Sequence, residues 1–258
     1  EEHPYANRFT PEDFDQVTPE LLIDFYRERI QSSQCRIMIC GNVSDSVLEE
    51  VSQAFAPMSN APLPPEKRFT IHPSTPGRYN VPKPDAVQTS IRIGKTGVPL
   101  LHEDYTYFQL LNTILGGYFG SRLMSNIREE KGYTYGIGSY NVTMPLASHW
   151  MIATDVNADK AEATIEECMK EIRRMQEEPV AEEELGLVKS YFNGELLREL
   201  DGVFAQSDAL KHKLNYGQDN TFYLRAIDRI RSCTPDDIMR LARKYLKPEE
   251  MYVITAGK

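Results

Sequence analysis

The stretch LGGYFGSRLMSNIREEKGYTYGIGSYN, residues 115–141, decides the fold. Gly116 and Gly117 interrupt an apolar run, and a second glycine turn leads into Ser121, a residue type that caps helix N-termini. Apolar residues then recur at helical spacing as far as Gly132, which tolerates the positive φ found just after a helix. The stretch therefore predicts a glycine-rich turn, a short helix and, beyond Gly132, a strand.

The predicted strand begins where the period changes from helical to two. Tyr133, Tyr135, Ile137 and Ser139 are expected on one face of this strand. Arg128 falls in the last turn of the preceding helix, and Tyr135 follows only three residues after Gly132. We therefore expect the Arg128 and Tyr135 side chains to converge.

The composition limits the classes of function. The chain has 258 residues, of which 41% are hydrophobic and 26% charged, as is ordinary for a soluble globular protein. A net charge of −9 argues against binding to nucleic acid or to an anionic membrane, and no apolar run is long enough to cross a bilayer. The 4 cysteines have no metal-ligand spacing and form no evident disulfide framework. They favour a reducing compartment, the cytoplasm.

Hydrophobic periodicity predicts an α+β fold, a mostly antiparallel sheet with helices packed on one face. Thr18 should cap the first long helix, whose buried stripe is expected to be Leu22, Phe25 and Tyr26. Val87 is expected to open a half-buried strand. The predicted helices are 18–30, 46–55, 103–115, 159–177, 181–200, 204–214, 221–231 and 235–246, and the other strands are 35–40, 87–94, 149–156 and 251–256.

Proline marks a boundary between domains. Half of the chain's 16 prolines lie between residues 57 and 84, where they remove donors that helices and sheets need. We therefore expect a linker at 57–77, a domain at 78–258, and at 1–56 the C-terminal tail of a preceding, homologous domain.

An internal repeat indicates that the preceding domain is homologous to the domain at 78–258. Residues 18–41 align without a gap on residues 234–257, at a constant offset of 216 positions. The helix-then-strand pattern matches throughout, and such an offset fits a duplicated domain better than a solenoid. The identical pairs are Thr18/Thr234, Pro19/Pro235, Arg27/Arg243 and Gly41/Gly257.

The sequence contains none of the common motifs for a catalytic nucleophile, a metal ion or a nucleotide. None of the 5 histidines belongs to an H-E-x-x-H or H-x-x-E-H motif. Ser121 lacks the G-x-S-x-G context of a nucleophile, and no lysine follows the glycines as a phosphate loop requires. The sequence therefore provides no nucleophile, no metal site and no nucleotide site.

The ordered elements GG, GSRL, IRE and G-x-x-Y, from Gly116 to Tyr135, resemble the signature of the pitrilysin-like (insulinase superfamily) zinc peptidases. The resemblance is to the domain that does not carry the metal, and it implies tandem, structurally similar domains. It also implies that Arg128 and Tyr135, seven positions apart, bind the substrate peptide opposite the zinc. No zinc is expected in this chain, because the family holds it with H-x-x-E-H on the preceding or a partner domain.

Simpler interpretations of these residues stay open. Arg128 could only complement its helix C-terminus and Tyr135 could only pack in the sheet. Gly116 and Gly117 are candidate substrate-binding backbone, although an ordinary turn also explains them.

Three functions remain, each with its own partners. The chain is part of a zinc endopeptidase, or a metal-free partner subunit of a heteromeric peptidase, or a non-catalytic core subunit. The expected partners are a peptide substrate and a zinc-bearing domain or subunit of the same family, with a homodimer as another arrangement. Alone, the chain is predicted to be inactive.

Overall fold

The computed structural model describes residues 4–60, 69, 72 and 74–258. They form two units, one of Glu1–Pro73 with Leu200–Lys211, the other of Ser74–Glu199 with His212–Lys258. Most of the predicted linker's centre lies outside the described residues.

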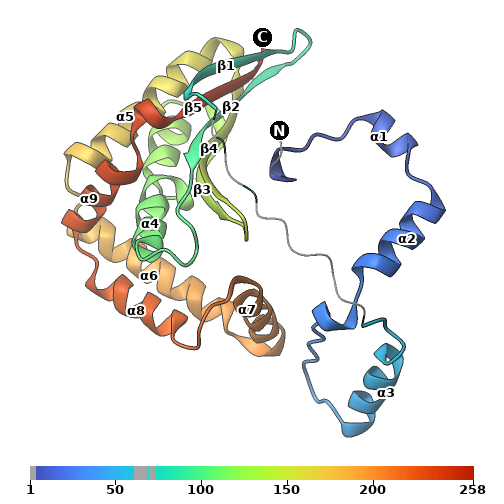
Figure 1. The fold of residues 1–258 in the computed structure, drawn as a ribbon. Coiled ribbons are helices and arrows are strands. Elements are labelled where there is room, and N and C mark those ends of the chain that lie inside the picture. Colours follow the sequence, from blue (N-terminus) through green and yellow to red (C-terminus); the bar gives the residue numbers. More distant parts are fainter. Residues whose placement is uncertain (1–3, 61–68, 70–71, 73) are drawn as a thin grey trace. The chain divides into compact units, whose positions relative to one another are not determined.

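The second unit is built on a five-stranded sheet with the order β1-β5-β2-β4-β3 (Figure 1). The β2–β4, β2–β5 and β3–β4 pairs are antiparallel, and only β1–β5 is parallel. The predicted α+β class with a mostly antiparallel sheet is confirmed. The strands are β1 Gly77–Pro82, β2 Gln88–Thr96, β3 Thr134–Thr143, β4 Ser148–Asn157 and β5 Tyr252–Gly257.

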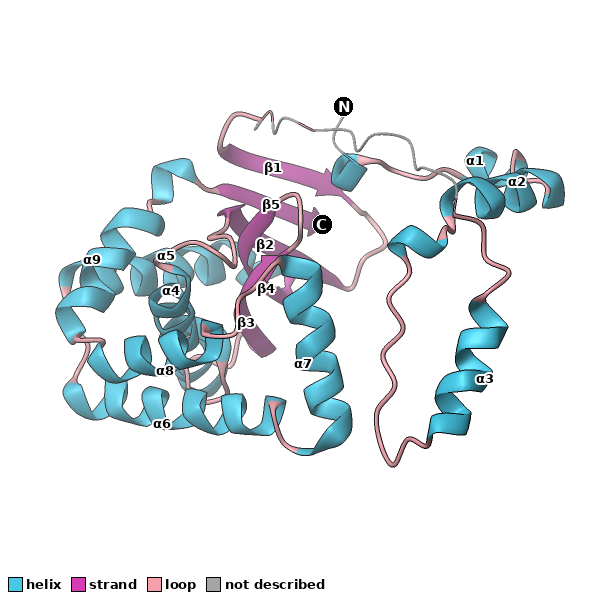
Figure 2. Cartoon of the chain, turned by 60° about the horizontal axis from the view of Figure 1, so that its bottom comes forward, coloured by secondary structure: helices cyan, strands magenta, loops and turns pink. Residues whose placement is uncertain are grey.

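Helices α4, α5 and α9 lie on one face of this sheet, as predicted (Figures 1 and 2). Their apolar stripes pack on the inward residues of β2 and β4, and the core includes Ile93, Trp150, Ile172, Leu241 and their neighbours. The α-helices after residue 74 are α4 Tyr105–Asn112, α5 Ala161–Glu177, α6 Glu182–Glu199, α7 Gly202–Tyr216, α8 Phe222–Ser232 and α9 Pro235–Tyr245.

The alternation in β2 is confirmed apart from its first residue. Thr89, Ile91 and Ile93 are buried, but Val87 is 89% exposed because the strand begins one residue later. No helix in the described part of the chain has both the length and the hydrophobicity that a bilayer crossing requires.

The first unit contains α1 Pro11–Asp15, α2 Pro19–Arg29 and α3 Asp45–Phe55. Thr18 caps α2 as predicted, its hydroxyl oxygen accepting a hydrogen bond of 3.2 Å from the Leu21 N–H. The expected burial of Leu22, Phe25 and Tyr26 is wrong, since all three are more than half exposed.

The strand predicted at 35–40 is also wrong. Ser32–Gln34 forms a 3₁₀ turn (η2), and residues 35–40 have no regular structure. A strand is stabilised by its neighbours' hydrogen bonds, and no described strand pairs with this segment. The apolar pattern is therefore present without the partner that would make it a strand.

Candidate functional site

The glycine-rich turn is pressed against β3. Helix α4 continues as a π-helix, η3 Thr113–Gly117, in which Gly116 is buried and Gly117 exposed. A Cβ at Gly116 would lie 2.6 Å from the backbone nitrogen of Ser139, so only glycine allows this close approach. Gly117 has more room, with its nearest neighbour, the Thr113 Oγ1, at 3.2 Å from a built Cβ.

Asn112 ties this turn to the sheet. Its side-chain amide donates to the Ser139 carbonyl at 3.0 Å, and the Ser139 hydroxyl donates to the Asn112 carbonyl at 3.1 Å. The Trp150 indole N–H donates to the Asn112 Oδ1 at 2.8 Å. These buried bonds fix the turn relative to β3 and β4.

The helix that carries Arg128 begins after Ser121 and passes into a second π-helix, η4 Met124–Glu130. It ends at Gly132, whose φ of +65° matches the prediction. The Ser121 side chain does not cap this helix as expected, because its hydroxyl is buried without a partner. The Ser121 carbonyl instead accepts the Ser125 N–H at 2.9 Å.

A β-bulge at the start of β3 sets the direction of Tyr135. Thr134 lies opposite Val156 and Ile137 opposite Thr154, so two residues of β3 face a single residue of β4. Tyr135 is consequently 94% exposed while Ile137 is 6% exposed. The prediction that these two residues share one face is wrong, because the extra residue shifts the alternation.

Arg128 and Tyr135 do converge, as the sequence predicts. The Arg128 Nε donates a hydrogen bond of 3.0 Å to the Tyr135 carbonyl. The guanidinium carbon lies 5.9 Å from the centre of the Tyr135 ring and 4.8 Å from that of Phe119, within cation–π distance of both. A cation and two exposed aromatic rings thus form one cluster on the surface.

Phe119 is a member of this cluster that the sequence pattern did not predict. It lies within the glycine-rich turn and is 63% exposed, and its ring stacks against the Arg128 guanidinium. An aromatic residue between two glycines was the available signal. The other neighbour of Arg128 is Glu129, with which it forms a long, partly exposed ion pair of 3.9 Å. Such a pair holds the guanidinium weakly.

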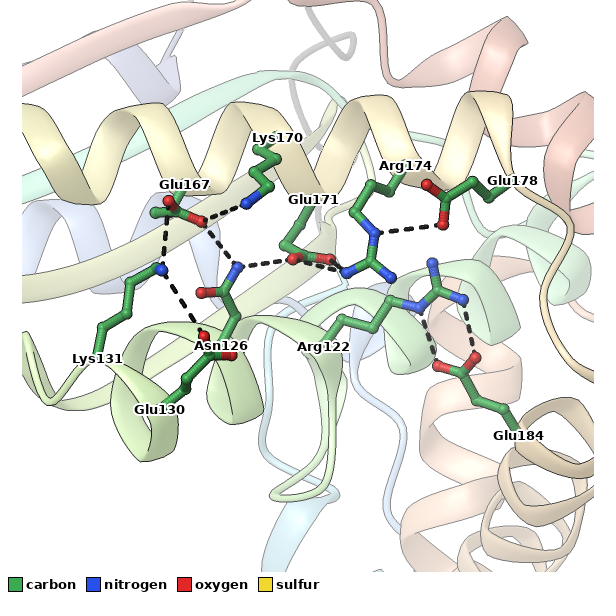
Figure 3. Close-up of polar contacts among 10 residues, drawn as sticks. All are labelled: Arg122, Asn126, Glu130, Lys131, Glu167, Lys170, Glu171, Arg174, Glu178 and Glu184. Atoms are coloured by element: carbon green, nitrogen blue, oxygen red, sulfur yellow. Dashed lines mark hydrogen bonds and ion pairs between the residues drawn. The ribbon is translucent and has the colours of Figure 1, made fainter.

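On another side of η4, charged residues from three elements surround a pocket of about 380 Å³ (Figure 3). Arg122 makes a two-point contact with Glu184 of α6, at 2.9 and 2.8 Å. Glu171 of α5 is 1% exposed, and both of its oxygens lie 3.1 Å from the Arg174 Nη1. The Glu171 carboxylate raises the pKa of Arg174. This cluster is not predictable from the sequence, because its members are distant along the chain.

The described residues contain no group of three or more His, Cys, Asp or Glu side chains placed to hold a metal ion. Together with the missing H-x-x-E-H motif, this means that the residues present do not fit a catalytic zinc ion.

Comparison with known proteins places the chain in a family. Residues 16–192, more than half of the chain, match the family model described as the Peptidase M16 inactive domain. The chain belongs to the M16 peptidase family. Its pitrilysin-like resemblance is thereby confirmed at the level of the family and of the inactive domain.

The curated relatives include proteins named as zinc proteases and one named as a probable inactive metalloprotease. An uncharacterized zinc protease of Rickettsia felis is 28% identical over 233 residues, 88% of this chain and 54% of the relative. A probable inactive metalloprotease of Bacillus subtilis, YmfF, is 20% identical over 210 residues, 80% of this chain and 49% of the relative. The chain therefore spans about half the length of the curated relatives it matches.

Solved structures share the fold. The peptidase M16 inactive domain from Pseudomonas fluorescens superimposes with a TM-score of 0.86 at 23% identity, covering 99% of this chain and 62% of that one. A chain of complex III from Candida albicans gives 0.76 at 15% identity, covering 96% of this chain and 61% of that one. At these identities the similarity is one of fold.

Proposed function

We propose that this M16 inactive domain supplies the substrate-binding side of a zinc endopeptidase site. Arg128 and Tyr135 bind the peptide and stabilise the transition state of its hydrolysis. The observation that carries the proposal is the surface cluster beside the bulge of β3, in which exposed Tyr135 and Phe119 flank the half-buried Arg128.

The chemistry of the pair suits this role. Peptide hydrolysis develops negative charge on the scissile carbonyl oxygen, and a guanidinium and a phenol are both hydrogen-bond donors. The Arg128 Nε donates to the Tyr135 carbonyl, which fixes the plane of the guanidinium, and its Nη groups, of which Nη1 makes only the long ion pair with Glu129, can meet a ligand. A tyrosine that is 94% exposed contributes little to the core, so its ring and hydroxyl are available to a substrate.

In this proposal the zinc ion belongs to another domain or subunit of the family, since this sequence lacks H-x-x-E-H and the described residues contain no metal-ligand group. The partners are that zinc-bearing unit and a peptide, and a homodimer is an alternative arrangement. Neither Arg128 nor Tyr135 can generate a nucleophile. Their part is to orient the peptide and to meet charge on its carbonyl oxygen.

A second candidate is a metal-free subunit, either lending the pair to a separate zinc subunit or serving only as a structural core. This second candidate is supported by the similar proteins, which include a probable inactive metalloprotease and a chain of complex III. An H-x-x-E-H motif elsewhere in the same polypeptide would select the single-chain enzyme. The Arg128–Tyr135 pair at the surface, which a purely structural subunit does not need, supports the roles in peptide binding.

Arg128→Ala, in the full-length protein or assembly that holds the zinc, tests the proposal. Alanine is a good helix former, so the helix should persist. Loss of a transition-state donor should lower kcat on the order of 10²-fold, whereas loss of peptide binding alone should raise KM with kcat little changed.

Arg173→Ala is the matched control, because Arg173 is an exposed arginine on α5. Arg122 lies nearer to Arg128 along the chain but is a poorer control, since its ion pair with Glu184 is mostly buried. Unchanged kcat and KM in Arg128→Ala would refute both roles.

A further inference from the structure

We propose that Asn126 is a positioning residue for Arg128. Its side-chain amide fastens η4 to α5 and thereby sets the helical register that points Arg128 at the Tyr135 carbonyl. The catalytic consequence rests on the proposed function, but the positioning itself does not.

The Asn126 amide bridges two carboxylates on one face of α5 (Figure 3). Its Nδ2 donates to the Glu171 Oε1 at 2.7 Å and to the Glu167 Oε2 at 3.0 Å. Carboxylates only accept hydrogen bonds, so the NH₂ end of the amide must face them. The Asn126 Oδ1 is buried without a partner, so the contact with α5 is made through the NH₂ group alone.

Both acceptors are themselves held in place. Glu171 is almost fully buried and its two oxygens receive the Arg174 guanidinium. The hydrogen bond from Asn126 lowers the pKa of Glu167, which also pairs with Lys131 at 3.5 Å. Because α5 buries Ile165, Cys168 and Ile172 in the core, the carboxylates are a rigid anchor for η4.

The register of η4 needs such an anchor, since π-helical turns are rare and short. The Lys131 N–H donates to the Asn126 carbonyl at 3.1 Å, a bond across five residues. Asn126 therefore anchors the same turn that contains Arg128. A register shift of one residue, which is a rotation of about 100° in an α-helix and somewhat less in the wider turn of a π-helix, would turn Arg128 away from the Tyr135 carbonyl. The bond from the Arg128 Nε to the Tyr135 carbonyl would then be lost.

The test uses this chain alone and observes Arg128 directly. Asn126→Asp keeps the shape of the side chain but replaces the donor with an oxygen facing two carboxylates. In an NMR measurement of solvent exchange at the Arg128 Nε–H, we expect the variant to exchange faster by on the order of tenfold as that hydrogen bond is lost. Ser125→Asp is the control, since it adds the same charge at the neighbouring, exposed position of η4.

The double variant Asn126→Asp with Glu171→Gln reverses donor and acceptor across the same contact. The glutamine amide can donate to the new carboxylate, so slow exchange at the Arg128 Nε–H should return, at least in part. A variant that merely weakened the fold would not be rescued in this way.

Two results would overturn the proposal. One is an unchanged Arg128 Nε–H in Asn126→Asp, and the other is equal acceleration in Asn126→Asp and Ser125→Asp. Hydrolysis kinetics keep the claims separate. If Arg128→Ala leaves kcat and KM unchanged in the zinc-containing assembly, the proposed function fails, while the exchange measurement still decides the role of Asn126.

Discussion

At the scale of single residues, the candidate site depends on how the backbone places Tyr135 beside the Arg128 guanidinium. The pair Arg128 and Tyr135 was predictable from sequence order, because a helix end and a strand start separated by a glycine turn must lie close together. The bulge that turns Tyr135 outward was not predictable. A bulge is decided by the pairing of β3 with β4, which local sequence does not contain.

Gly116 and Gly117 should separate packing from substrate binding. A methyl group at Gly116 would collide with the backbone of Ser139, so Gly116→Ala should destabilise the fold by about 1–3 kcal/mol. Urea unfolding of this chain measures that loss.

Gly117→Ala is the contrasting variant, because Gly117 is exposed and its contacts can relax. It should change the free energy of unfolding by less than about 1 kcal/mol, so any rise in KM of the assembled enzyme would report contact with the peptide. Wild-type stability in Gly116→Ala would contradict the packing argument.

At the scale of elements, α2 and α9 extend the internal repeat from sequence to conformation. The helices Pro19–Arg29 and Pro235–Tyr245 begin and end at equivalent positions, and so do the 3₁₀ turns Ser32–Gln34 and Pro248–Glu250. Thr18 and Thr234 accept the same capping bond at 3.2 Å. This agreement supports the proposal that residues 18–41 close a second domain of the same kind.

The two segments that the repeat aligns differ in burial. In α9, Ile238, Leu241 and Ala242 are fully buried, whereas their counterparts Leu22, Phe25 and Tyr26 are exposed. The counterpart of β5 is the segment 36–41, which overlaps the strand predicted at 35–40 and has no regular secondary structure. The repeat remains the basis of the duplicated-domain proposal, and the strand that it predicts would need a neighbouring strand.

Hydrogen exchange should expose this difference. In the full-length protein or its assembly, the amides of residues 36–41 should be protected to a similar degree as those of residues 252–257 in β5, because both segments would be sheet strands. In this chain alone, only residues 252–257 should be protected. Rapid exchange at 36–41 in the assembled protein would contradict the duplicated-domain proposal.

At the scale of the whole molecule, the sequence predicted the α+β class, the helices on one face and the M16 family. Those features follow from hydrophobic period, turn residues and an ordered motif, all of which are local. The cluster of Arg122, Asn126, Glu171 and Glu184 could not be predicted, because the charges come together only when η4, α5 and α6 pack. Phe119 is intermediate, since its position was visible but its contact with Arg128 was not.

The central claim, that this chain provides donors to a peptide at a zinc site held elsewhere, is tested most directly by Tyr135→Phe in the zinc-containing assembly. The substitution removes one hydroxyl and keeps the exposed ring, so the melting temperature should not change. We expect kcat for peptide hydrolysis to fall on the order of 10²-fold. Tyr133→Phe, which removes a hydroxyl two residues away, should leave kcat nearly unchanged. Equal and small changes in kcat and KM for both variants would contradict the claim.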